Sequence, residues 1–149
     1  MAEPEVRDGQ LGGGSNDPLV PARLSMVVLN AHDLPGLRRF YRALGWTEQP
    51  GASDSLARYQ LGGVDLALYP YADDPAAAGT ATTEPRSAVT LVITLATADG
   101  VDDAFGAAVG AGAQPVSDPQ DQPWGGRSAV VADPEGSRWE LLWVPRPNR

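Results

Sequence analysis

The chain repeats one order of secondary structure, and this repeat restricts the folds that it can adopt. Each half consists of a strand, then a helix, then further strands. Apolar residues alternate or run continuously in the strands and recur every three or four positions in the helices. The predicted elements are strand 23–31, helix 32–46 and hairpin 55–71, then strand 88–97, helix 98–112 and strands 113–117, 128–132 and 137–144. Matching the two helices gives a period of about sixty residues.

One half of this kind cannot cover both faces of its own sheet, so the two halves must share a core. We therefore predict an α+β fold in which two βαβββ repeats form a curved eight-stranded sheet around a cleft, with the helices outside. The length of 149 residues fits a single domain, over residues 22–145. Its halves cover about 23–71 and 88–145, a linker covers 72–87, and residues 1–21 are expected to be a flexible acidic tail.

The composition excludes several kinds of active site. The chain has no Cys and one His, which excludes a thiol nucleophile and a zinc site made of two or three His. All eleven basic residues are Arg, so there is no Lys for a Schiff base. The formal net charge of -8 disfavours a nucleic-acid partner. We also expect no membrane partner and a cytoplasmic location, because no apolar run could span a bilayer and the first residues lack a secretory signal.

Three segments carry a resemblance to a known superfamily. They are DLPGLRRFYRALGW in the first half, and GVDDAFGAAVGAGA and PWGGRSAVVADPEGSRWELLW in the second. Together they cover most of residues 23–145, and the last is the most specific. The chain resembles the vicinal oxygen chelate superfamily, which includes glyoxalase I, extradiol dioxygenases, fosfomycin-resistance enzymes and bleomycin-resistance proteins.

The resemblance implies four positions for metal-binding side chains, one on the first and one on the last strand of each half. These positions hold Met26, Ala67, Ile93 and Glu140. Since Glu140 alone offers an oxygen ligand, we expect neither a metal nor another cofactor. Met26, Ala67 and Ile93 would instead make the cleft floor apolar, which suits an organic ligand. In this respect the chain is closest in character to the metal-free, resistance-type binding proteins.

Glu140 stands between Trp139 and Leu141 on a strand that is otherwise apolar, so its charge needs a partner if it is buried. Three roles are open: an ion pair with an Arg such as Arg58, a contact to a ligand, or acid–base catalysis. Alternation along the strand puts Trp139 and Trp143 on the opposite face from Glu140, which predicts that they belong to the core.

Aromatic side chains are the other candidate ligand contacts. Trp124 lies in a Pro-Trp-Gly-Gly turn, where its ring could stack on a planar molecule or simply pack the turn onto the sheet. Tyr59 and Tyr69 lie on the predicted first hairpin and could line the cleft, although core packing is an alternative for each. His32 is expected at a solvated helix entrance, outside the metal positions.

These observations favour a metal-independent protein that binds and sequesters an aromatic or polycyclic small molecule, neutral or cationic, in an apolar cleft. Its predicted ligand contacts are Met26, Tyr59, Ala67, Tyr69, Ile93, Trp124 and Glu140. One alternative is a metal-independent isomerase, cyclase or lyase of secondary metabolism that uses Glu140 or a Tyr as acid or base. A third is a metal-dependent lyase or dioxygenase. The resemblance also implies a homodimer with its clefts at or near the interface.

Overall fold

The computed structural model describes residues 18–73 and 89–146, and the structural statements below concern these residues. Most of the predicted tail and linker therefore lies outside the described residues. The first half contains β1 (Met26–Ala31), α1 (Leu34–Ala43), β2 (Ala57–Leu61), β3 (Val64–Pro70) and the short 3₁₀ helix η3 (Tyr71–Asp73). The second half contains β4 (Thr90–Thr94), α2 (Ala98–Gly110), β5 (Gln114–Asp121), β6 (Arg127–Ala132) and β7 (Arg138–Trp143).

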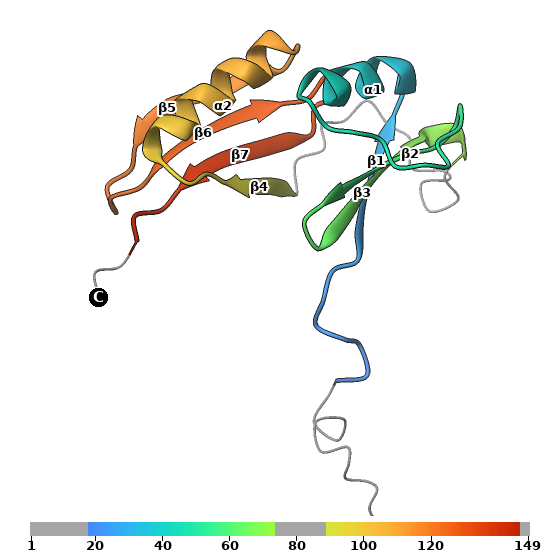
Figure 1. The fold of residues 1–149 in the computed structure, drawn as a ribbon, viewed down its shortest axis with the longest axis horizontal. Helices are drawn as coiled ribbons and strands as arrows, with labels where there is room; N and C mark the ends of the chain where they lie inside the picture. The colour runs from blue at the N-terminus through green and yellow to red at the C-terminus, as the bar shows by residue number, and fades with distance from the viewer. Residues whose placement is uncertain (1–17, 74–88, 147–149) are drawn as a thin grey trace, which may run out of the picture.

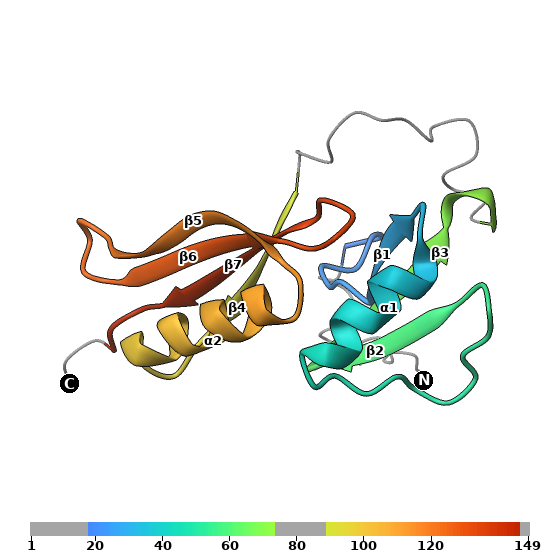
Figure 2. The ribbon, with the colours of Figure 1, turned by 90° about the horizontal axis from the view of Figure 1, so that it is seen from above.

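The two halves have the same topology. The strand order is β1-β3-β2 in the first sheet and β4-β7-β6-β5 in the second, with the first strand of each half parallel to the last. The two sheets lie side by side, and α1 and α2 cover them from the same side (Figures 1 and 2). The predicted α+β fold of repeated strand–helix–strand units is confirmed.

Seven of the eight predicted strands form within the described residues. In the first half, residues 46–49 run beside β2, where the backbone N–H of Gln49 donates to the carbonyl of Arg58 at 2.7 Å, but they form no regular strand. Pro50 and Gly51, whose φ is +94°, turn the chain away immediately afterwards. A turn at this point leaves no room for a continued ladder.

The sequence of α1 specifies both its start and its buried face. The Asp33 carboxylate accepts a hydrogen bond from the Gly36 N–H at 3.1 Å, and Pro35 occupies the first turn, as the sequence predicts. Gly45, with φ +95°, follows the end of the helix. Three- and four-residue spacing places one apolar face against the sheet. Its buried residues are Leu34, Leu37, Phe40 and Tyr41.

A buried hydrogen-bonded chain joins the two halves. The Tyr41 hydroxyl of α1 donates to the Asp133 carboxylate at 2.6 Å, and the indole N–H of Trp139 donates to the Tyr41 oxygen at 2.9 Å. Asp133 also accepts from the backbone N–H groups of Glu135 and Ser137, each at 2.9 Å. All three side chains are at most 6% exposed. Since buried polar groups are costly without partners, this chain of bonds fixes how α1 meets the β6–β7 turn.

The same turn holds the entrance of α1. The Glu135 carboxylate accepts from the backbone N–H groups of His32 at 3.1 Å and Asp33 at 2.8 Å. The His32 ring, which is exposed, stacks on Tyr71 with ring centroids 4.5 Å apart. The main core accordingly crosses the boundary between the halves, because buried Ala108, Ala113, Val131 and Trp139 of the second half belong to the same cluster as α1 and the first sheet.

Within the described residues, no helix has both the length and the apolar character needed to cross a membrane. The cytoplasmic location expected from the sequence stays a prediction.

Candidate functional site: a cleft between the two halves

The first sheet has one face packed under α1 and one open face, and strand pairing assigns residues to each. Met26 and Val28 of β1 lie on the open face and are 38% and 41% exposed. Val28 pairs with Ala67 of β3, which in turn pairs with Arg58 of β2. Tyr69 lies on the same face, two residues beyond Ala67. Three predicted contacts, Met26, Ala67 and Tyr69, therefore share this face, but Ala67 is fully buried there by its neighbours.

Glu140 lies on the open face of the second sheet. It pairs with Val92 of β4 on one side and Val130 of β6 on the other, and it is half-buried. Among the described residues it forms no hydrogen bond or ion pair. The ion pair with Arg58 considered from the sequence is not formed between these two residues. Glu140 is thus a carboxylate between two valines, available to a ligand or to solvent.

Two predicted contacts lie on the helix-facing sides instead. Tyr59 is 1% exposed, and its hydroxyl donates to the Glu48 carboxylate at 3.2 Å. Ile93 pairs with Leu141 and packs on the core under α2. Trp139, predicted to face away from Glu140, is 6% exposed and belongs to the core, so that prediction is confirmed.

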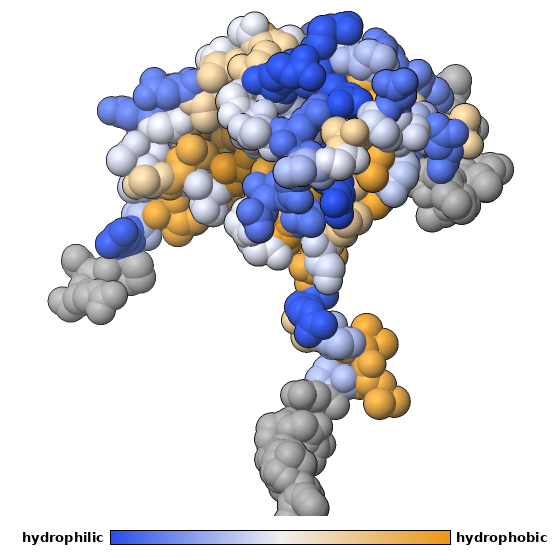
Figure 3. Space-filling view, turned by 45° about the vertical axis from the view of Figure 1, so that its right-hand side comes forward, coloured by the Kyte–Doolittle hydropathy of each residue, from blue (hydrophilic) through white to orange (hydrophobic). Residues whose placement is uncertain are grey.

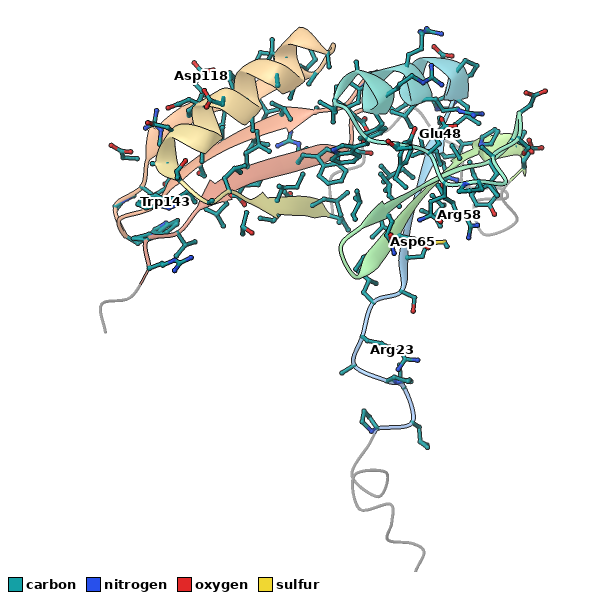
Figure 4. All side chains as sticks on the ribbon, in the orientation of Figure 1. Arg23, Glu48, Arg58, Asp65, Asp118 and Trp143 are labelled. Carbon is teal, nitrogen blue, oxygen red and sulfur yellow. The ribbon has the colours of Figure 1, made fainter. Side chains whose placement is uncertain are left out.

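Trp124 lies in the turn between β5 and β6 and is 56% exposed. Its ring lies over Gly126, where a Cβ atom would come within 2.2 Å of it and within 2.6 Å of the Trp143 carbonyl. Gly126 is therefore required for this packing. Figure 4 shows Trp143 at the end of the second half that is remote from Asp65 and Arg58 of the first half. Within one chain, Trp124 thus lies apart from the boundary between the halves.

A hollow with a volume of about 590 Å³ lies at that boundary, between β4 and the β2–β3 hairpin, and is called the wide cleft below. Of the seven predicted ligand contacts, Ile93 alone is among the described residues that line it. These described lining residues are Leu24, Val27, Trp46, Leu61, Val64, Asp65, Leu66, Thr90, Leu91, Val92, Ile93, Thr94 and Trp139. Hydrophobic residues gather on the hollowed underside of the molecule, below the more hydrophilic helices (Figure 3).

Trp46 is the main residue of the wide-cleft lining that sequence reasoning missed. Its ring meets Trp139 edge-on, with centroids 5.5 Å apart and an angle of 74°, and it stacks on Tyr41 at 5.3 Å. The signal available in the sequence was its place directly after the glycine that ends α1, where the chain must cross from the helix back toward the sheet. A large ring at such a crossing lies at the boundary between packed units.

An ion-pair cluster fixes the segment that carries Trp46. Arg38 donates to both Glu48 oxygens, at 2.9 and 2.7 Å, and to the carbonyl of Ser53 at 2.6 Å. The hydrogen bonds from Arg38 lower the pKa of Glu48. Burial, and next the nearby Glu48 charge, raise the pKa of Tyr59 to about 12. The cluster holds residues 46–49 against α1 and so positions the Trp46 ring.

Among the described residues that line the wide cleft, Asp65 alone is charged. Its carboxylate accepts a long hydrogen bond, 3.4 Å, from the Gln49 side-chain amide. Among the described residues, no three His, Cys, Asp or Glu side chains lie close enough together to hold a metal ion. Of the positions that the resemblance assigns to metal ligands, Met26, Ala67 and Glu140 lie on the open faces of the sheets, whereas Ile93 faces the core under α2 and Val92 lies opposite Glu140.

The sequence model of the family described as "Glyoxalase-like domain" matches residues 26–142. No curated protein matches. Similar solved structures include a glyoxalase-related enzyme from Fulvimarina pelagi, with 26% identity and a TM-score of 0.75 over 83% of this chain and 89% of that one.

A glyoxalase/bleomycin resistance protein/dioxygenase from Nocardioides is 25% identical, with a TM-score of 0.71 over 95% of this chain and 98% of that one. A lactoylglutathione lyase from Agrobacterium tumefaciens is 19% identical, with a TM-score of 0.64 over 83% of this chain and 95% of that one, and shows the fold alone. The family match covers both halves and the cleft between them. The chain therefore belongs to the glyoxalase-like domain family, within the vicinal oxygen chelate superfamily that its sequence resembles.

Proposed function

We propose that the protein binds and sequesters an aromatic or polycyclic small molecule in the wide cleft, without a metal. The observation that carries the proposal is the lining: of the thirteen described residues that line the cleft, one is charged and two are threonines, and the others are apolar or aromatic. A cleft of about 590 Å³ lies within the range of small-molecule sites, which are mostly apolar with a few polar groups.

The geometry of the two indoles supports a planar ligand. Trp46 and Trp139 meet edge-on, so one face of Trp46 is not covered by Trp139, and Trp139 itself is held by its bond to Tyr41. Aromatic rings held in this way lose little freedom when they stack on a ligand. Asp65 at the cleft would favour a cationic ring system over an anionic one, in keeping with the net charge of -8.

A titration with acridine, a neutral tricyclic probe, tests the proposal. Binding should quench tryptophan fluorescence with one probe per cleft, and the probe should be recovered unchanged. Val92→Glu places a charge in the lining and should weaken binding by at least about tenfold. The matched control Val109→Glu, on the exposed side of α2, should leave it unchanged. Equal affinity for wild type and Val92→Glu would exclude the wide cleft as the site.

The half-buried Glu140, which has no hydrogen-bond or ion-pair partner in the described part of the chain, supports one alternative, a metal-independent enzyme that uses this carboxylate as acid or base. Chromatography of the recovered probe, or of candidate natural products, separates the two functions. A product that appears with wild type but not with Glu140→Gln would favour the enzyme.

We also propose a homodimer. β1 and β4 are edge strands, each paired on one side only within the described residues, and both carry exposed valines, Val28 at 41% and Val92 at 50%. Unpaired edges with apolar side chains are unfavourable in water and are commonly covered. Light scattering measures the mass of the protein in solution. The mass of Val92→Glu must be measured as well, because this change could weaken acridine binding by disrupting the dimer.

A further inference from the structure

A second hollow lies between α1 and α2, on the other side of the two indoles from the wide cleft. This alanine hollow has a volume of about 200 Å³, and the described residues that line it are all apolar or aromatic. The lining residues are Phe40, Leu44, Trp46, Ile93, Ala104, Ala107, Ala108, Val131, Trp139 and Leu141. The N–H of Trp139 points to the Tyr41 oxygen, so it does not offer the hollow a free donor.

The hollow exists because α2 carries small side chains where α1 carries large ones. Ala104 and Ala108 are four residues apart and so lie on one face of α2, with Ala107 beside them. α1 contributes Phe40 from the other side. Three methyl groups cannot fill the space that one or two leucines would occupy. The hollow is open on the side of the exposed Ala107, so it is not a sealed cavity. Its apolar lining suits an apolar guest, and for scale a sealed apolar cavity of about 150 Å³ takes up benzene.

The hollow adjoins the proposed ligand site. Trp46, Ile93 and Trp139 line both the wide cleft and the alanine hollow, so these three side chains form the wall between the two. A molecule that lies against this wall in the wide cleft is next to the hollow, and a substituent that passes the edge of the wall enters it. A charged or strongly polar substituent would lose its hydration there without gaining a hydrogen bond.

We propose that the alanine hollow is a specificity subsite, which accepts a neutral, ring-sized apolar substituent of the ligand held in the wide cleft. The subsite rests on the proposed function for the identity of that ligand. It predicts that the protein selects planar molecules bearing such a substituent over the unsubstituted ring system.

Acridine and 9-phenylacridine form a matched pair for testing the subsite. Wild type should bind the phenyl derivative at least about tenfold more tightly. Ala104→Leu, which fills the hollow without touching the wide cleft, should bind acridine as before but lose this preference to within about twofold. Ala107→Leu at the more exposed side gives a second variant, and Ala43→Leu on the exposed end of α1 is the control. A preference that persists in both filled variants, or that is missing in wild type, would overturn the subsite.

Fluorobenzene, followed by ¹⁹F NMR, keeps the two proposals distinguishable. If acridine does not bind, the function proposed for the wide cleft fails, and the hollow is then tested alone. Broadening of the fluorobenzene signal by wild type, but not by Ala104→Leu, would support a ring-sized site. Identical signals with both proteins would refute it.

Discussion

Removing one oxygen atom, by Tyr41→Phe, should destabilise the whole molecule. The Tyr41 hydroxyl donates to the Asp133 carboxylate at 2.6 Å and accepts from the Trp139 N–H at 2.9 Å, and the Tyr41 side chain is fully buried. A hydrogen bond to a charged group contributes about 1.5–3 kcal/mol, and a buried N–H without an acceptor costs about 1–3 kcal/mol. Together these effects predict a loss of about 3–5 kcal/mol in the free energy of unfolding.

Urea unfolding followed by circular dichroism measures this loss directly. A loss near 3 kcal/mol should also lower Tm by roughly 6–12 °C for a chain of this size. Tyr69→Phe is the matched control, because the Tyr69 hydroxyl has no hydrogen-bond partner among the described residues and should change the free energy by less than about 0.5 kcal/mol. If the two variants were equally stable, the buried chain of bonds would not be what joins the halves.

Three further predictions concern charge and assembly. Burial raises the pKa of Tyr41 and Tyr59, so the folded state keeps protons that the unfolded chain releases above pH ~10, and stability should fall as the pH rises toward about 12. The chain has no Lys or Cys to titrate between pH 10 and 12, so Tyr59→Phe should reduce the slope of unfolding free energy against pH by up to about 1.4 kcal/mol per pH unit. An unchanged slope would contradict the raised pKa of Tyr59. Proflavine, a cationic relative of acridine, should bind several-fold more tightly than acridine. In titrations, Asp65→Asn should remove this difference in affinity. If Glu140→Gln removed it instead, the cation would lie at Glu140 and not at Asp65. Val28→Glu on the edge strand β1 should convert a dimer to a monomer in light scattering, whereas a dimer that survives the change would exclude this edge from the interface.

The fold could be predicted because its signals are local and occur twice. Asp33, Pro35 and Gly45 define α1 by cap and turn chemistry that needs no knowledge of the other half. The Asp-Pro-Glu-Gly turn between β6 and β7 likewise follows from local chemistry, with Gly136 at φ +95°. The missing strand of the first half follows from the same chemistry, because Pro50 and Gly51 interrupt the segment that would have formed it.

The faces of the strands were harder to assign. β4 is apolar at Leu91, Val92 and Ile93 in succession, so alternation gives no indication of which side faces α2. A shift of one residue along a strand exchanges its two faces. The sequence-based assignment put Ile93 on the same face as Glu140, whereas the structure puts Val92 there. On β2 the alternation was informative, because Arg58 and Gln60 flank Tyr59 and place it with the buried residues.

The wide cleft could not be predicted from the sequence of either half alone. Trp46 and Trp139 are ninety-three positions apart in the sequence, and they meet because Tyr41 and Asp133 fix how the halves pack. Each repeat predicts its own sheet and helix, but the space left between two packed repeats depends on side chains such as Ala104 and Ala108 that carry no signal of their own.

The most direct test of metal-free binding in the wide cleft is an NMR titration of the protein with acridine in the presence of excess EDTA. The account predicts saturable shifts of the Val92 and Ile93 methyl groups and of the Trp46 indole, with the same affinity when the chelator is omitted. Binding that disappears with EDTA and returns with a divalent cation, or shifts that leave these three residues unchanged, would contradict it.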